Sequence, residues 1–172
     1  DIADTAVSIT VDGETVVEDF QFAEFTDYLP LPYAGDYDVA VFAGVTEALS
    51  ATLTVEAGKE YSVSAIGGAN GWPLEFFVLD DDNSDPAAGN AHLRIAHTAP
   101  FATTAAETEV DFCTQAGDLV GGLTGVPYKV ASGYLPLPAG TYDLKVMDAA
   151  AEPCNGDRSE ERRVGKECRS RW

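Results

Sequence analysis

An acidic run, "DDDNSD" at residues 80–85, has the residue types and spacing best suited to hold a metal ion. Asp81, Asn83 and Asp85 place oxygen-bearing side chains at alternate positions, as calcium-binding loops do. Pro86 stands where such loops need glycine, and the closing glutamate has no counterpart. Two interpretations remain open: a weak Ca²⁺ site on these three residues, or an acidic linker rich in Asx turns, which is favoured. No other cofactor is expected.

The two histidines suggest no catalytic site. His97 shares the strand parity of Leu93 and Ile95, so we expect a hydrogen-bonded structural histidine on an apolar face. His92 is expected in solvent near the linker. Neither has an identifiable nucleophile beside it, and the motifs GxSxG, HExxH, GxGxxG and the P-loop do not occur. The sequence therefore predicts a protein that is not an enzyme.

The stretch "GGANGWP" at residues 67–73 predicts a hairpin tip that carries Trp72. A tryptophan at such a tip can form a contact platform for a carbohydrate or a protein. It can equally fold back over the end of a β-sandwich, and this second interpretation is favoured.

Cys113 and Cys154 lie in the second half of the chain, and the first half, which resembles it, has no cysteine at either aligned position. Because both cysteines occur in one half and neither occurs in the other, a disulfide between them is favoured. Disulfides form in oxidising compartments. Two unrelated thiols are the alternative. The spacing does not fit a structural zinc site.

The formal net charge is −19, but the charge is unevenly distributed. Residues 158–172, "RSEERRVGKECRSRW", hold six basic and three acidic residues, whereas residues 1–157 hold four basic and 26 acidic ones, a net charge of −22. So acidic a body repels nucleic acid and anionic membranes. No apolar run is long enough for a membrane helix, so membrane insertion is not expected.

The basic tail resembles the in-frame translation of a sequencing adapter, read as its reverse complement. This resemblance predicts that the tail, with Cys168, is not native and is not part of the fold. No N-terminal signal segment is visible, and Asp1 opens in the middle of a pattern.

Alternating apolar residues predict strands throughout the chain. "YDVAVF", "LEFFVL", "HLRIAH" and "YDLKVM" have this period, and "ATLTVEAGKEYSVSAI" has it on both sides of a turn at Ala57-Gly58. The fold class predicted is all-β, built from antiparallel β-sandwich modules. The expected core of the first module is Tyr37, Val39, Leu53, Val55, Tyr61 and Val63.

The motif "YLPLP" occurs twice, at residues 28–32 and 134–138. Two prolines two residues apart place both missing N–H groups on one side of an extended strand, so the motif should lie at a sheet edge or leave the sheet. Aligning "YDVAVF" with "YDLKVM", and "SITVDG" with "ETEVDF", indicates a tandem repeat.

The repeat predicts four segments: a first β-sandwich repeat at 1–79 without its first strand, an acidic linker at 80–91, a C-terminally truncated second repeat at 92–157, and the tail at 158–172. A truncated second repeat would leave an apolar face uncovered. Alternatively, "HLRIAH" could pair into the first repeat in place of its missing first strand, at the expense of the second repeat. Its expected core is Leu93, Ile95, Val110, Phe112, Tyr142, Leu144 and Val146.

The stretches "YLPLPAGTYDLKV", "LTVEAGKEYSVSAIGG" and "LEFFVLDDDNSDPAAGNAHLRIAHTAP" together resemble domain of unknown function 4397 over most of residues 1–150. The resemblance implies an immunoglobulin-like or transthyretin-like sandwich in an extracellular or cell-envelope protein. We expect a non-catalytic structural, spacer or adhesion module. The alternative is an accessory carbohydrate- or protein-binding domain of a larger secreted enzyme. Either role implies an extracellular protein or carbohydrate partner.

Overall fold

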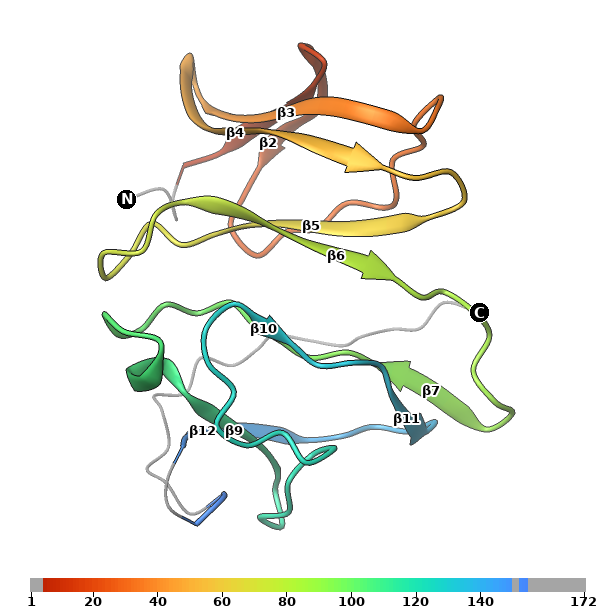
Figure 1. Ribbon diagram of the computed structural model, residues 1–172, viewed down its shortest axis with the longest axis vertical. Helices are drawn as coiled ribbons and strands as arrows, with labels where there is room; N and C mark the ends of the chain where they lie inside the picture. Colours follow the sequence, from red (N-terminus) through yellow and green to blue (C-terminus); the bar gives the residue numbers. More distant parts are fainter. Residues whose placement is uncertain (1–4, 150–151, 155–172) are drawn as a thin grey trace. The chain divides into compact units, whose positions relative to one another are not determined.

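The computed structural model describes residues 5–149 and 152–154, and the fold is all-β (Figure 1). Every strand pairing in the described chain is antiparallel, and the several sheets form the β-sandwich fold that the sequence predicted. The chain divides into two compact units, Asp1–Asp85 and Pro86–Trp172, referred to as unit 1 and unit 2. The basic tail and Cys168 lie outside the described residues.

Unit 1 contains a four-stranded sheet in the order β2-β1-β3-β4. Asp12 and Gly13 connect β1 to β2 with φ of 49° and 81°, the left-handed pair that a two-residue hairpin turn requires. An Asp-Gly dipeptide supplies this conformation at low cost, so this hairpin follows directly from the sequence. The strands are β1 (Val7–Val11), β2 (Glu14–Phe20), β3 (Gly35–Ala43) and β4 (Thr46–Val55).

A second sheet in unit 1 is the hairpin of β5 (Glu60–Ile66) and β6 (Glu75–Asp81). The predicted turn at Ala57-Gly58 carries the chain from β4 into this separate sheet, so β5 does not return along β4. Strand β6 also contacts β4, and Figure 1 shows the hairpin running along the four-stranded sheet.

The buried core of unit 1 is small. Tyr37, Val41 and Ile66 are its buried apolar residues among those described. Val63 was predicted in this core, but it is 43% exposed and pairs with the equally exposed Val78. The buried end of β5 is Ile66, whose side chain has the opposite strand parity.

Unit 2 is built from three short antiparallel pairs, β7·β11, β8·β10 and β9·β12. The predicted strand "HLRIAH" is split at Arg94 and Ile95, and both parts pair within unit 2, so the expectation that it might pair into the first repeat was wrong. The strands are β7 (Asn90–Leu93), β8 (Ala96–His97), β9 (Val110–Thr114), β10 (Val130–Ala131), β11 (Leu135–Pro138) and β12 (Leu144–Asp148), with a short 3-10 helix, η2, at Ala106–Thr108.

The apolar face of β9, expected to be uncovered, is covered by the segment 118–128. The N–H of Val120 donates to the carbonyl of Phe112 at 2.8 Å, and that of Phe112 donates to the carbonyl of Leu123 at 3.0 Å. Tyr142 and Leu144 were expected in this core but are 44% and 36% exposed. The core cluster contains Val110, Phe112, Val120 and Val126, with Ile95, Leu123, Leu135 and Val146 packed against it.

The β1·β3 and β9·β12 ladders correspond in register once "YDVAVF" is matched with "YDLKVM". Ile9 pairs with Val41, and Phe112 pairs with Val146. Phe112 is therefore the counterpart of Ile9, whereas the sequence alignment placed it opposite Gly13.

Candidate functional site

The β2–β3 loop, residues 21–34, exposes six large apolar side chains. Asp19, near the end of β2, and Ala23, in the loop, adopt left-handed φ values of 52° and 67°, which turn the chain away from β2. Phe25 is 90% exposed. Exposed aromatic side chains gathered on one loop are typical of a contact surface. The six are Phe22, Phe25, Tyr28, Leu29, Leu31 and Tyr33.

A polar network anchors this loop to the β5·β6 hairpin. The hydroxyls of Tyr28 and Ser62 donate to Oδ2 of Asp81, at 2.7 and 2.6 Å. The side-chain amide of Asn83 donates to the Tyr28 hydroxyl at 3.0 Å and to the Glu60 carboxylate. Burial raises the pKa of Tyr28, the Asn83 hydrogen bond opposes this change, and Asp81 adds to it.

Asp81 and Asn83 thus belong to a hydrogen-bonded network, while Asp85, the third residue of the predicted calcium site, is exposed. Within residues 5–149 and 152–154, no group of three or more His, Cys, Asp or Glu is placed to hold a metal ion. The Ca²⁺ site at Asp81, Asn83 and Asp85 stays a prediction.

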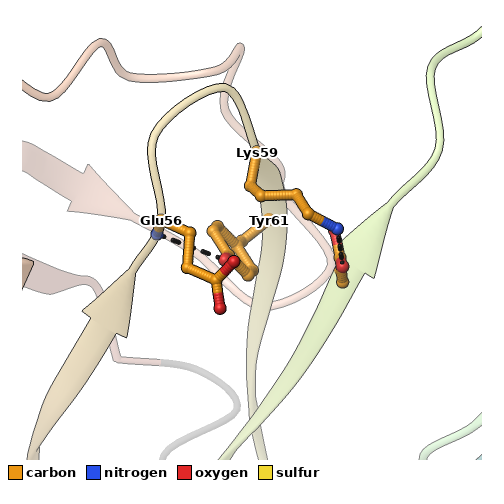
Figure 2. A network of polar contacts seen from close by, with 4 residues as sticks. Glu56, Lys59 and Tyr61 are labelled. Atoms are coloured by element: carbon orange, nitrogen blue, oxygen red, sulfur yellow. Dashed lines mark hydrogen bonds and ion pairs between the residues drawn. The ribbon is translucent and has the colours of Figure 1, made fainter. Parts of the chain in front are cut away.

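Lys59 engages another member of the acidic run. Figure 2 shows it beside the turn that links β4 to β5, with Glu56 and Tyr61. Its Nζ lies 2.6 Å from Oδ2 of Asp80, and this hydrogen bond and charge raise the pKa of Lys59. The N–H of Glu56 donates to the Tyr61 hydroxyl at 3.3 Å. Since the ion pair is exposed, it positions the hairpin more than it stabilises it.

In unit 2, Cys113 and Cys154 form a disulfide in the structure, with their Cα atoms 5.9 Å apart. Beside it lies Asp111, which is fully buried and which the sequence reasoning missed. Its carboxylate accepts hydrogen bonds from the Thr124 hydroxyl and from the N–H groups of Gly125 and Cys154, at 2.8–3.0 Å. Burial alone would raise the pKa of Asp111, but these three donors outweigh it and lower the pKa.

The histidines have structural surroundings. As predicted, His97 is buried on the apolar side of its strand, and its Nε2 lies 2.8 Å from the Thr108 carbonyl, so Nε2–H donates. Burial lowers the pKa of His97, and the bond to Thr108 offsets part of that effect. His92 is half-buried against the ring of Tyr134 at 5.9 Å, rather than in solvent as expected.

Trp72 lies half-buried at the β5–β6 turn. Its carbonyl accepts from the N–H of Gly68 at 3.0 Å, and its own N–H donates to the carbonyl of Ala69 at 3.0 Å. Gly67 has φ of 94°, and a Cβ there would lie 1.9 Å from the Pro73 carbonyl oxygen, so this turn requires glycine. A contact role for Trp72 stays a prediction. Most of the exposed aromatic side chains lie in the β2–β3 loop, whose irregular spacing gave no periodic signal.

No helix in the described part of the chain is long and apolar enough to cross a bilayer. In the comparison with known families, the sequence model of Domain of unknown function (DUF4397) matches residues 2–106. No curated protein and no solved structure matches the chain.

Proposed function

This chain belongs to the DUF4397 family, and on that premise we propose that it is a non-catalytic β-sandwich module that works outside the cytoplasm. Its role is structural, as a spacer or as an adhesion module. The acidic body, with a net charge of −22 over residues 1–157, supports a protein kept soluble at a surface or in an external medium.

The observation that carries the proposal is the Cys113–Cys154 disulfide. Disulfides persist in exported proteins and are reduced in most cytosols. The bridge ties β9, the most deeply buried strand of unit 2, to the region after β12. A link at this position supports folding in an oxidising compartment.

Cell fractionation tests the location. An antibody against residues 5–149 should detect the protein in the envelope or the medium of the source cells, and protease added to intact cells should remove any surface-bound protein. Mass spectrometry of the natural protein should recover Cys113 and Cys154 in one cross-linked peptide. A cytoplasmic protein with both thiols free would contradict the proposal.

The second candidate function is an accessory carbohydrate- or protein-binding domain. The exposed β2–β3 loop favours it, since exposed aromatic rings stack on sugars and anchor protein interfaces. The test is binding to a glycan array and to cell-wall polysaccharides. Phe25→Ala should abolish binding, whereas Val45→Ala, a 99% exposed site on the β3–β4 turn, is the matched control.

A further inference from the structure

Strand β9 divides its side chains between two faces. Val110 and Phe112 enter the apolar cluster of unit 2, whereas Asp111 and Cys113 alternate with them along the strand and share the opposite face. Both Asp111 and Cys113 are fully buried. A buried carboxylate is costly unless hydrogen bonds satisfy it. The second face of β9 therefore holds an acid and a cysteine side by side, and the acid needs hydrogen-bond donors.

The two carboxylate oxygens of Asp111 accept from different segments. Oδ1 accepts from the Thr124 hydroxyl at 2.8 Å and from the N–H of Gly125 at 2.9 Å, both in the segment that covers β9. Oδ2 accepts from the N–H of Cys154 at 3.0 Å. One oxygen thus holds the covering segment, and the other holds the chain that follows β12.

The residues after β12 return to β9, and residues 152–154 are called the strap here. The N–H of Ala149 donates to the carbonyl of Glu109 at 2.9 Å, which continues the β9·β12 ladder beyond the pair of Asp148 and Val110. Cys154 instead lies back at the cysteine and acid of β9. Its φ of 62° is left-handed and unfavourable for a residue other than glycine, so this conformation needs a contact that maintains it.

The equivalent ladder of unit 1 has neither the acid nor the cysteine. In the register of the β1·β3 and β9·β12 ladders, Ser8 occupies the place of Asp111, and Thr10 occupies the place of Cys113. The two residues therefore occur together in one unit and are replaced together in the other. This is the pattern expected if the acid serves the cysteine.

We propose that Asp111 is a positioning residue for the oxidation of Cys113 and Cys154. Its Oδ2 holds the N–H of Cys154, and so holds the strap against β9, before the disulfide forms. The Cα atoms of the two cysteines are 5.9 Å apart in the structure, the separation that a disulfide requires. The inference goes beyond the exported role, because it concerns the isolated chain and holds whichever compartment supplies the oxidant.

With oxidised glutathione as the oxidant, the reaction has two exchange steps. Cys154 is half-buried and Cys113 fully buried, so the Cys154 thiolate attacks a glutathione sulfur and releases one glutathione. The Cys113 thiolate then attacks the Cys154 sulfur of the mixed disulfide and releases the second glutathione. Each protein thiol loses a proton, each released glutathione thiolate gains one, and the two electrons pass to glutathione. Asp111 changes no bond and acts by raising the local concentration of Cys154 at Cys113.

A glutathione titration of the purified chain measures the equilibrium constant for disulfide formation. Alkylation of the free thiols and mass spectrometry give the oxidised fraction at about pH 8, where thiolates exchange. All chains carry Cys168→Ser, so that the tail thiol does not compete.

The variant Asp111→Asn breaks the contact with the strap selectively. Thr124 and Gly125 place two donors on one side, so the remaining oxygen stays there and the amide nitrogen faces the N–H of Cys154. The equilibrium constant should fall about tenfold, the effect of one lost hydrogen bond to a charged group. Thr124→Val is the matched control, since it removes a bond to the other oxygen and should leave the constant unchanged. Equal constants for the two variants would overturn the proposal.

A cycle with the pair Cys113→Ser and Cys154→Ser separates positioning from a merely structural role. Asp111→Asn should reduce the equilibrium constant for folding about tenfold more in the disulfide form than in the serine pair, as urea denaturation measures. Equal losses in the two backgrounds would show that Asp111 only stabilises unit 2, and the proposal would fail.

Hydrogen exchange in the reduced chain tests the proposal without a substitution at Asp111. After treatment with dithiothreitol, the N–H of Cys154 should stay protected, because Asp111 still accepts its hydrogen bond. A reduced chain in which this N–H exchanges freely, or in which unit 2 unfolds, would overturn the proposal. In either case Asp111 would hold nothing before the disulfide forms.

Discussion

The two YLPLP copies have identical residues and different structures. The copy at residues 134–138 contains β11 and contributes Leu135 to the core, whereas the copy at 28–32 is exposed and outside any strand. The motif fixes which side of the chain can pair, because its prolines block one side. Whether it pairs depends on a partner strand from elsewhere in the sequence.

The two units also differ in how many apolar side chains they bury. Unit 1 has a four-stranded sheet and few buried side chains, whereas unit 2 has short paired strands around a compact apolar cluster. In unit 2 the segment 118–128, together with the buried Asp111 and the disulfide, holds the core closed. The number of ladder pairings is therefore a poor guide to burial.

Reduction of the disulfide should cause the largest difference between the units. A cross-link between residues 41 apart stabilises by about 4 kcal/mol in the chain-entropy description. Dithiothreitol should lower the free energy of unfolding of unit 2 by that order and leave unit 1 unchanged. Hydrogen exchange measured by NMR reports both units in one sample. An equal loss in both would show that they unfold together.

Asp111→Ala should have the next largest effect, about 3 kcal/mol, because it leaves the partly buried N–H groups of Gly125 and Cys154 without an acceptor. Asp36→Ala in unit 1 is the matched control. Asp36 also accepts a hydrogen bond, from the Thr54 hydroxyl at 2.6 Å, but in an exposed position, so we expect a loss below about 1 kcal/mol. Urea denaturation measures both, and similar values would contradict the buried role of Asp111.

Val126→Ala should destabilise unit 2 by about 2 kcal/mol, since it removes buried methyl groups from the segment that covers β9. Val63→Ala truncates a valine that is already largely in solvent, and its cost should be below about 0.5 kcal/mol. The comparison fails if Val63→Ala is the more damaging variant.

The smallest expected effect is on pH dependence. Burial lowers the pKa of His97 in the folded state, so the neutral form is favoured there and the stability is fully present above the ordinary pKa of about 6.5. It is lost as the pH falls through the folded-state pKa. Unit 2 should therefore weaken on mild acidification, and His97→Gln should flatten that dependence. Unit 1 has no histidine and serves as the internal control.

Local pattern by itself determined much of this protein. Alternating apolar residues predicted β3, β6 and β12, and the Asp-Gly pair accounts for the β1–β2 hairpin. The motifs identified the family, and the distribution of cysteines indicated the Cys113–Cys154 pairing. These features depend on neighbouring residues or on composition, so they can be read without a fold.

Only the tertiary structure decided which segments meet. In the fold, Tyr142 and Leu144 are exposed and Val120 and Val126 cover β9. Asp111 is buried among three hydrogen-bond donors. It also paired one YLPLP copy and left the other exposed. Strand alternation defines two faces for each strand but does not say which face is covered, because the covering residues come from distant parts of the chain.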